Sequence, residues 1–511
     1  MNLAILLDMA ASGAPDRLAV GRTGSGFTYA ELRRHALVAA ELIMRAGAPR
    51  VVYLGGNSEL FPLTLFAAAA AQVPIVPINY RLGTAQLTEL LNSQPAGTLV
   101  VYDRQFRLPE ADVQPVTTDE WTRQILTTRS PARNLPTADP GIAVLLYTSG
   151  TSATPKAAVL RHQHLMSYIL NAVEFASASD TEATLVTVPP YHIAGVATIL
   201  SNLYAGRRIV YLDRFEPAAW LALAHAEKVT NAMLVPTMLA RIVYHLDAHP
   251  GPVPPIVTLA YGGARMPLPV IERALALFPD AGFVNAYGLT ETSSTIAVLG
   301  PQDHRDALSS INPAVRTRLA SAGRPVPGLE VQIRSEDGRP LPTDQVGELW
   351  VRGPQVSGEY LGLGTVTDTD GWFPTKDLAR ADAEGYLFIE GRLDDTIIRG
   401  GENISPAEIE DVILRHPHIA ECVVVGPSDD EWGQRLAAVI VPTSADELDV
   451  NELTTWIGAR LRSSKTPDEI HIWPELPQTD TGKIVRRRVL AALTGDQPGL
   501  PRFLGPIRPV S

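Results

Sequence analysis

The chain contains a single cysteine among its 511 residues, Cys422. One cysteine excludes both an intramolecular disulfide and a metal site built from several thiolates. Cys422 stands in the apolar segment ECVVVG, a pattern that is typical of a buried strand. We therefore predict that its thiol packs in a core as a small apolar group and takes no part in catalysis.

The chain also lacks an excess of positive charge. Its 43 Lys and Arg residues are outnumbered by 55 Asp and Glu residues, which gives a formal net charge of −12 at pH 7. Because nucleic acids and anionic membrane surfaces bind basic faces, this balance argues against both as the main partner. We expect no nucleic-acid partner, and we interpret the short basic run at residues 486–488 as a solvated face.

A long uniform apolar run is missing as well. The longest apolar stretch, residues 60–78, contains Gln72 and three prolines, which favours a buried helix followed by a buried strand. The first residues carry no basic region, and Asp8 interrupts their apolar run, so the sequence predicts no signal peptide. We expect no integral membrane segment and a cytoplasmic location.

The composition and length indicate a folded protein of more than one domain. Apolar residues make up 45% of the chain and charged residues 19%, and 511 residues are long for a single domain. Through the first 390 residues helical periodicity alternates with short apolar strands, as where the helical pattern 29–47 precedes the strand pattern 50–55. This alternation predicts an α/β fold with layered, largely parallel sheets.

The pattern changes after about Leu329, where short alternating strands are separated by Gly and Asp turns. These strands predict antiparallel hairpins or a small β-barrel-like part. A compact α+β segment of about 100 residues follows the polar stretch RLDD, and a segment of that size can fold on its own. We predict a large N-terminal domain over residues 1–393, a small C-terminal domain over 394–492, and a Pro/Gly-rich tail over 493–511.

Residues 147–160, YTSGTSATPKAAVL, combine hydroxyls, small residues and one cation between two apolar runs. Small residues let backbone N–H groups converge on an anion, while the hydroxyls and the lysine add donors and charge. So many donors favour a polyphosphate over a carboxylate. The donors in this loop are Thr148, Ser149, Thr151, Ser152 and Lys156, around Gly150.

This loop fails the GxxxxGK[ST] pattern of a P-loop. Lys156 is preceded by Pro155 and followed by Ala157, so the glycine and the magnesium-binding hydroxyl of that motif are both missing. The flanking apolar runs also predict a hairpin between two strands, whereas a P-loop joins a strand to a helix.

The loop instead resembles the phosphate loop of the adenylate-forming superfamily, which includes acyl- and aryl-CoA synthetases, luciferases and peptide-synthetase adenylation domains. Residues 80–91 and 188–195 resemble weaker family segments, so the resemblance covers about residues 25 to 490 and is greatest to the acyl-CoA synthetases. Four further segments resemble family motifs in the family's order: NAYGLTETSS (285–294), GWFPTKD (371–377), GRLDDTIIRGGENISPAEIE (391–410) and PQTDTGKIVRR (478–488).

The resemblance implies an AMP-forming acid–thiol ligase. Such an enzyme joins a carboxylic acid to ATP, releases pyrophosphate, and passes the acyl group from the adenylate to CoA. The N-terminal domain would bind ATP and the acid, and the mobile C-terminal domain would carry a catalytic lysine. The implied cofactors are ATP, Mg²⁺ and CoA, and the implied role lies in fatty-acid or aryl-acid metabolism.

The resemblance also implies roles for single residues. Thr290 would bond the α-phosphate, Glu291 would hold Mg²⁺, and Lys483 would act in adenylation. His192 would lie beside the acyl carboxylate, with a purely structural histidine as the alternative. The residues implied for ATP or AMP binding are Thr148, Ser149, Gly150, Thr151, Lys156, Gly262, Gly263, Ala264, Asn285, Ala286, Tyr287, Gly288, Asp377 and Arg392.

Within this set, three residues would hold the nucleoside. Asp377 and Arg392 would bind the ribose, since a carboxylate offers two acceptor oxygens to a diol, and Tyr287 would lie against the adenine. The resemblance further implies a hinge at Asp394 or Asp395 and a path for the CoA arm at Gly400 and Gly401.

Two other functions remain open. The first is an adenylating enzyme that loads a carrier protein. Members that use amino acids place an aspartate near the segment YHIAG, whereas no acidic residue occurs from Leu185 to Leu212. A buried ammonium without a partner is costly, so an amine-free acid is favoured. The second is a degenerate member that binds nucleotide or adenylate without making it, because the chain departs from the family's glycines at Ala153, Ala157 and Lys376. Every charged catalytic position is nevertheless kept, which favours activity.

Overall fold

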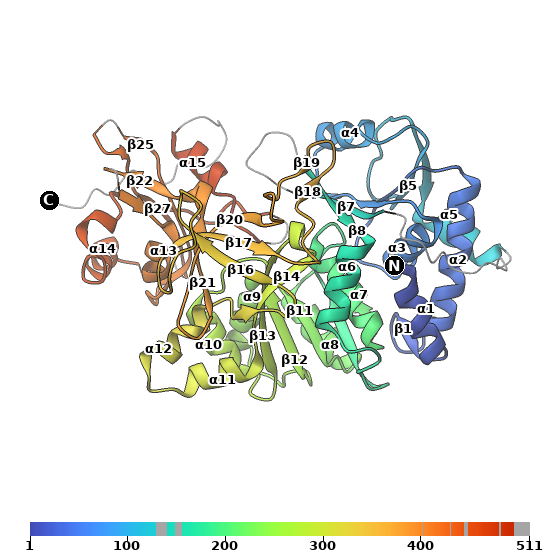
Figure 1. The fold of residues 1–511 in the computed structure, drawn as a ribbon. Coiled ribbons are helices and arrows are strands. Elements are labelled where there is room, and N and C mark those ends of the chain that lie inside the picture. The colour runs from blue at the N-terminus through green and yellow to red at the C-terminus, as the bar shows by residue number, and fades with distance from the viewer. Residues whose placement is uncertain are drawn as a thin grey trace.

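The computed structural model of the chain, drawn as a ribbon in Figure 1, describes residues 1–128, 141–148, 156–400, 402–429, 431–443, 448–479 and 482–494. The predictions that lie outside these described residues are those for Ser149, Gly150, Thr151, Ser152, Ala153, Gly401 and the end of the chain from residue 495.

The first sheet has nine strands in the order β15-β14-β13-β12-β11-β9-β10-β1-β2. Its central strands run parallel and antiparallel pairs lie at both edges, so the predicted largely parallel sheet is confirmed. The strands are β1 (Leu18–Val20), β2 (Phe27–Thr28), β9 (Ala183–Val186), β10 (Arg208–Tyr211), β11 (Asn231–Leu234), β12 (Thr258–Gly262), β13 (Gly282–Leu289), β14 (Ser294–Leu299) and β15 (Arg324–Pro325).

The second sheet has eight strands in the order β19-β18-β8-β7-β4-β3-β5-β6. Strands β7 and β8 are antiparallel, with Thr148 opposite Lys156, so the two flanks of the predicted phosphate loop form the expected strand pair. The strands are β3 (Val51–Leu54), β4 (Ile75–Pro77), β5 (Thr98–Tyr102), β6 (Val113–Thr117), β7 (Ile142–Thr148), β8 (Lys156–Arg161), β18 (Glu359–Tyr360) and β19 (Gly364–Thr365).

Helices pack between and around these two sheets (Figure 1). One continuous apolar core includes Phe66 of α3, Ile199 of α7, Val144 of β7 and Ile209 of β10, and it therefore joins both sheets. The helices of this part are α1 (Ala4–Gly13), α2 (Tyr29–Arg45), α3 (Leu60–Ala71), α4 (Thr84–Asn92), α5 (Thr118–Thr127), α6 (His162–Ala172), α7 (Ile193–Ala205), α8 (Pro217–Ala226), α9 (Pro236–Ala248), α10 (Leu268–Leu277), α11 (Pro301–Ser309) and α12 (Pro313–Arg316).

The most apolar segment of the chain forms α3 and the following strand β4, as predicted. Helix α3 is buried around most of its circumference, and all three residues of β4 are buried. Apolar residues on every side of a helix favour a place inside a large core. None of the helices in the described ranges has the length and apolar character needed to span a bilayer.

The region predicted as hairpins or a barrel-like part is a four-stranded antiparallel sheet in the order β16-β17-β20-β21. Its alternating residues bury one face, where Leu349, Val351 and Phe373 form a small core. The strands are β16 (Glu330–Arg334), β17 (Gly347–Arg352), β20 (Phe373–Ala381) and β21 (Leu387–Arg392).

The C-terminal elements form a three-stranded sheet with its own apolar core, and Figure 1 shows them beside β17 and β20. Cys422 lies in this core with 4% of its surface exposed, which confirms the prediction of a buried strand cysteine. The elements are β22 (Ile397–Arg399), β23 (Glu402–Ile404), α13 (Pro406–Leu414), β24 (Ile419–Val425), β25 (Ser428–Asp429), β26 (Gly433–Gln434), β27 (Ala437–Pro442), α14 (Val450–Gly458), β28 (Glu469–Ile472) and α15 (Arg486–Thr494). Short 3₁₀ turns complete the chain: η1 (Thr290–Thr292), η2 (Thr317–Ala320), η3 (Leu393–Asp395) and η4 (Ser463–Lys465).

Candidate active site

The predicted ribose-binding residues lie together on neighbouring strands. In the antiparallel pair β20–β21, Asp377 stands opposite Arg392, and a guanidinium nitrogen lies 2.9 Å from a carboxylate oxygen of Asp377. The hydroxyl of Tyr287, on β13, donates to the other carboxylate oxygen at 2.5 Å. The structure therefore brings Arg392 and the distant Tyr287 to one carboxylate, that of Asp377, which is only 4% exposed.

Burial and charge act in opposite directions on this group. Burial raises the pKa of Asp377, and the attractions of Arg392, Tyr287 and Lys483 oppose that rise. The pKa of Tyr287 is raised by burial and by the adjacent carboxylate, so its phenol stays protonated and can donate. A buried carboxylate with a cation and a neutral donor is a charge-assisted acceptor site for a polar ligand.

Lys483, in the C-terminal part of the chain, has an exposed side chain and lies near enough to Asp377 for the two charges to act on each other. A turn holds the lysine: the N–H of Thr479 donates to the carbonyl of Lys483 at 2.7 Å, and the N–H of Gly482 donates to the carbonyl of Thr479 at 2.8 Å. Packing and the Arg392 cation lower the pKa of the Lys483 ammonium, while Asp377 opposes that shift. Arg392 thus pairs directly with the carboxylate and Lys483 adds a second positive charge near it, an arrangement that favours binding of a further anion.

The turn before Lys483 lies against helix α9 of the N-terminal part. Gly482 has a φ of +74°, and a Cβ atom built on it would lie 1.9 Å from Oγ1 of Thr237, the second residue of α9. Only glycine fits such a close approach in this backbone conformation. Two further contacts join the parts, an ion pair of Arg265 with Asp411 and a hydrogen bond from Ser405 to the carbonyl of Glu390.

The interpretation of residues 486–488 as a solvated face is wrong for Arg486. Its guanidinium pairs with Glu410 of α13 and lies 3.4 Å from a carboxylate oxygen of Asp395 in η3. Burial lowers the pKa of Arg486 and the two carboxylates raise it, and the attraction of the carboxylates prevails. Arg487 and Arg488 are exposed, as predicted.

A second group of predicted site residues surrounds Glu291 in η1. The side chain is 9% exposed, and one of its carboxylate oxygens accepts a hydrogen bond of 2.6 Å from the hydroxyl of Tyr360. Its backbone carbonyl accepts from the N–H of Ser357 at 2.8 Å. Thr290, the predicted α-phosphate residue, precedes Glu291 in the same turn and is partly exposed.

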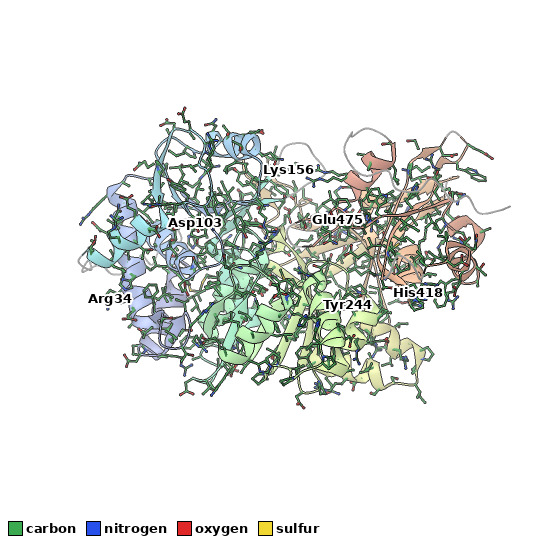
Figure 2. All side chains as sticks on the ribbon, turned by 180° about the vertical axis from the view of Figure 1, so that it is seen from behind. Arg34, Asp103, Lys156, Tyr244, His418 and Glu475 are labelled. Carbon is green, nitrogen blue, oxygen red and sulfur yellow. The ribbon has the colours of Figure 1, made fainter. Side chains whose placement is uncertain are left out.

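Lys156 lies beside this group. It begins β8, its side chain is exposed, and its ammonium lies 5.8 Å from the centre of the Tyr360 ring. Thr148 closes the strand pair by donating from its hydroxyl to the carbonyl of Lys156 at 3.3 Å. Figure 2, viewed from behind, shows Lys156 near the boundary between the N-terminal elements and the C-terminal elements.

The predicted nucleotide-binding glycines stand where backbones approach closely. A Cβ atom on Gly262 would lie 2.2 Å from the carbonyl oxygen of Ala286, and one on Gly288 would lie 1.6 Å from that of Ser294. Gly263 follows with a φ of +86°. The side-chain amide of Asn285 donates to the carbonyl of Ser321 at 3.0 Å, and Ala264 is exposed just beyond β12. These residues therefore lie in close-packed backbone at or near the C-terminal ends of β12 and β13.

His192 is the residue before α7 and is partly exposed. Its ring lies 4.9 Å from the ring of Tyr191, which in turn contacts Tyr80 at 5.5 Å. The histidine therefore belongs to an aromatic cluster in the segment between β9 and α7.

The predicted hinge and CoA-path residues lie on the C-terminal side of the site. Asp394 is exposed in η3, next to the paired Asp395. Gly400 ends the described part of the turn between β22 and β23, has a φ of +56°, and donates its N–H to the carbonyl of Trp432 at 2.8 Å. A Cβ atom on Gly400 would lie 3.0 Å from the Trp432 ring, so this turn favours glycine.

The structure separates two of the departures from the family pattern. Lys376 has a φ of +63° and an exposed side chain, so it occupies a left-handed conformation that glycine adopts more easily. Ala157 lies in β8 opposite Tyr147, with 6% of its surface exposed and no left-handed backbone angle. Alanine is therefore compatible with the backbone at position 157, and position 376 carries the strain.

Sequence reasoning missed two residues of this site, Tyr360 and Thr237. Tyr360 is 69 residues from Glu291 in sequence, and Thr237 meets Gly482 only through the docking of the C-terminal part. No local pattern marks either residue.

Comparisons with known proteins agree with this architecture. The profile of the AMP-binding enzyme family matches residues 7–361, more than half of the chain, and that of the AMP-binding enzyme C-terminal domain matches residues 408–483.

Relatives of known function align over almost the whole chain. Feruloyl-CoA synthase from Amycolatopsis sp is 32% identical over 497 residues, which cover 93% of this chain and 96% of the relative. Fatty acid–[acyl-carrier-protein] ligase ScoC from Streptomyces coeruleorubidus is 32% identical over 511 residues, which cover 94% of each protein.

A solved structure has the same fold. The o-succinylbenzoate CoA synthetase MenE from Bacillus subtilis, in complex with its acyl-adenylate intermediate, superposes with a TM-score of 0.82 at 27% identity, over 95% of this chain and 97% of that chain. The predicted fold class and the predicted AMP-forming acid–thiol ligase activity are confirmed by these matches. The chain belongs to the AMP-binding enzyme family, within the superfamily of adenylate-forming enzymes.

Proposed function

We propose that this chain adenylates an amine-free carboxylic acid at the site between Asp377 and Lys156 and then transfers the acyl group to CoA. The single observation that carries the proposal is the convergence of Asp377, Tyr287, Arg392 and Lys483 from three separate segments. A carboxylate with polar partners suits a ribose diol, and a cation beside it suits the phosphates that the same ribose carries on its 5′-oxygen.

The nucleoside end of ATP would bind first to the rigid strands. The Asp377 carboxylate would accept hydrogen bonds from the ribose hydroxyls. These bonds would replace part of its present contacts with Tyr287 and Arg392. The flat adenine ring would bind beside Tyr287, near the C-terminal ends of the paired strands β12 and β13. This orientation would direct the phosphates toward Glu291 and Lys156.

The polyphosphate end would meet Lys156 and the hydroxyl of Thr148. Glu291 fits a magnesium site, because Mg²⁺ is commonly held by one or two carboxylates together with substrate phosphates. Within the described ranges no group of three or more His, Cys, Asp or Glu residues could hold a metal ion. A metal ion beside Glu291 would therefore need the substrate phosphates as further ligands. When bound, Mg²⁺ would neutralise charge on the phosphates. The MenE protein has also been solved with ATP and a magnesium ion, at a TM-score of 0.80 and 27% identity.

Lys483 would carry out the adenylation step. An oxygen of the substrate carboxylate attacks the α-phosphorus, the bond from that phosphorus to the bridging oxygen of pyrophosphate breaks, and pyrophosphate leaves. Two anions repel each other along this path, so a cation at the point of attack lowers the barrier. The ammonium of Lys483 supplies that cation in the closed arrangement, where the Gly482 turn lies against Thr237.

Thioester formation would follow after the C-terminal part turns about Asp394 or Asp395. The turn would break the Arg265–Asp411 ion pair and withdraw Lys483, and it would bring Gly400 and Gly401 toward the acyl adenylate. The thiolate of CoA then attacks the acyl carbon, and AMP leaves with the electron pair of the broken carbon–oxygen bond.

The chemistry of the acid follows from the residues near His192. No acidic residue occurs from Leu185 to Leu212, so an α-amine would find no carboxylate partner there. The neighbourhood is apolar or aromatic, with Tyr191 and with Met238, whose sulfur accepts a hydrogen bond from Thr187. An aryl or acyl monocarboxylate without an amine fits this environment.

One relative loads a carrier protein, so a carrier-protein thiol is the second candidate acceptor. The test of the whole proposal measures pyrophosphate release from ATP with a panel of aryl, aliphatic and amino acids, for the wild type and for Lys483→Ala. We expect release with an amine-free acid and its loss in the variant. A broad panel that gives no acid-dependent release would contradict the proposal and favour the degenerate alternative. Product analysis with CoA and with a pantetheinylated carrier protein then identifies the acceptor.

A further inference from the structure

The short hairpin of β18 and β19 lies between two predicted phosphate-site residues, Lys156 of β8 and Glu291 of η1. Glu359 and Tyr360 pair with Thr365 and Gly364 within the hairpin, and Tyr360 also stands opposite Ala158 of β8. The N–H of Leu361 donates to the carbonyl of Ala157 at 2.9 Å, so the hairpin is hydrogen-bonded to the strand that Lys156 begins.

An ion pair fixes the hairpin on β8. The guanidinium of Arg161 makes two hydrogen bonds to the carboxylate of Glu359, at 2.8 Å and 2.9 Å. A bidentate pair of this kind restrains orientation as well as distance. The backbone before the hairpin is held too, because the Ser357 hydroxyl donates to the carbonyl of Val159.

The side chain of Tyr360 then reaches both predicted phosphate-region charges. Its hydroxyl donates to Oε1 of Glu291 at 2.6 Å, and the Lys156 ammonium lies 5.8 Å from its ring centre. The first contact is a short charge-assisted hydrogen bond, and the second lies within the range of a cation–π attraction. Burial and the adjacent carboxylate raise the pKa of Tyr360, so the hydroxyl remains a donor across the physiological range.

We propose that Tyr360 is a positioning residue of the adenylation site, whose hydroxyl fixes one carboxylate oxygen of Glu291 and whose ring seats Lys156. This inference rests on the proposed function. The hydrogen bond occupies Oε1 and leaves Oε2 of Glu291 for a metal ion, since a carboxylate has two oxygens and several acceptor positions. The ring holds the lysine cation on the same side, so both charges address one polyphosphate.

A hydrogen bond that positions Glu291 can be distinguished from a purely structural one by the property that its loss changes. A donor that only stabilised the fold would lower stability when removed, whatever ligand is present. A donor that orients a metal-binding carboxylate changes the contribution of the metal to nucleotide binding, and loss of such an outer partner costs about 10- to 100-fold in metal affinity.

The experiment measures the dissociation constant of ATP by calorimetry, once with Mg²⁺ and once with a chelator. The ratio is the constant with the chelator divided by the constant with Mg²⁺, and it reports how much the metal strengthens ATP binding. In Tyr360→Phe the ring that faces Lys156 is kept and the hydroxyl is lost. We expect the ratio to fall by about 10-fold or more relative to the wild type, with little change in the constant measured without Mg²⁺. Replacement of Tyr360 by 4-aminophenylalanine, which keeps the ring and an N–H donor at the position of the hydroxyl, should recover part of the ratio.

The matched control is Tyr386→Phe, because the Tyr386 hydroxyl also donates to a carboxylate, Asp303, at 2.6 Å, outside the proposed site. This variant should leave the ratio at the wild-type value. A second control adds Tyr360→Phe to Glu291→Gln, where the ratio should fall no further than in Glu291→Gln alone.

The inference is overturned if Tyr360→Phe keeps the wild-type ratio, or if Tyr386→Phe lowers the ratio equally. Failure of the proposed function has a different signature, because wild-type protein would then release no pyrophosphate with any acid while its ratio of ATP constants is still measured. Should Tyr360→Phe fold poorly, the ratio measured with 4-aminophenylalanine at position 360 decides the matter, since a value near that of Glu291→Gln would overturn the inference.

Discussion

Replacing Gly482 by alanine should separate the two halves of the reaction. Gly482 carries a φ of +74°, and its added Cβ atom would lie 1.9 Å from Oγ1 of Thr237, where ordinary contacts begin near 3.4 Å. The turn that holds Lys483 must therefore retreat from α9 by about 1.5 Å. The clash belongs to the docked arrangement of the C-terminal part in this structure, which we propose to be the adenylating one.

The structure sets the size of the effect. Misplacing a catalytic group by about 1 Å costs on the order of 100-fold in rate, which corresponds to about 2.7 kcal/mol of activation free energy. The left-handed backbone adds about 1–2 kcal/mol for alanine in either orientation of the C-terminal part, so the variant should also be less stable. We expect adenylation by Gly482→Ala to be about 100-fold slower than by the wild type.

The assay measures each half-reaction by itself. Acid-dependent pyrophosphate release reports adenylation, and thioester formation from a synthetic acyl adenylate and CoA reports the second half. Adenylation should fall and thioester formation should stay within about twofold of the wild type. Thr237→Ala, which removes Oγ1 and the methyl group, should restore part of the adenylation rate in the double variant. Equal losses in both halves, or no loss in adenylation, would refute this reasoning.

Three further outcomes follow from the site. Lys376→Gly should raise the free energy of unfolding by about 0.5–1 kcal/mol and with it the thermal unfolding midpoint, because the left-handed strain that glycine relieves exceeds the extra backbone entropy that glycine loses on folding. A lower midpoint would contradict this expectation. Ala157→Gly should lower stability by about 0.5–1 kcal/mol, because the site is a buried strand position, and faster pyrophosphate release would count against this view. Only protonated Lys483 carries charge and its pKa is lowered, so the adenylation rate should fall as pH rises through a value below about 10.4. Lys483→Arg should abolish this fall in the pH–rate profile. A fall in the wild type that is centred at or above the ordinary pKa of lysine would contradict the assignment.

The elements of the fold could be predicted where the sequence carries a strong period or an unbroken apolar segment. Residues 60–78 form a buried helix and a buried strand, as their length and composition predict. The alternating segments after Leu329 form antiparallel strands because period-two alternation buries one face of a sheet. These signals are local, so a single sequence is enough to detect them.

The grouping of site residues came from the order of motifs and from no local pattern. Asp377 and Lys483 are more than a hundred residues apart, and the resemblance supplied the expectation that both serve one nucleotide. Tyr360 and Thr237 were missed because their contacts depend on strand register and on the docking of the C-terminal part. Arg486 was interpreted as solvated because its partner Glu410 is a neighbour in space only.

The departures from the family pattern also needed the structure. Ala157 and Lys376 both replace an expected glycine, and the sequence gives no means of ranking them. The backbone angles separate them, because a left-handed angle occurs at Lys376 and none occurs at Ala157. Strain is a property of the backbone conformation, which a residue type alone does not specify.

The most direct test of the central claim follows oxygen from the acid into AMP. The acid is labelled with ¹⁸O in its carboxylate, incubated with ATP, Mg²⁺, CoA and the enzyme, and the AMP is analysed by mass spectrometry. Attack of the carboxylate on the α-phosphorus predicts one ¹⁸O atom in the AMP phosphate, in the wild type and at a much lower rate in Lys483→Ala. Formation of ADP with the label in inorganic phosphate, or thioester with unlabelled AMP, would contradict the account.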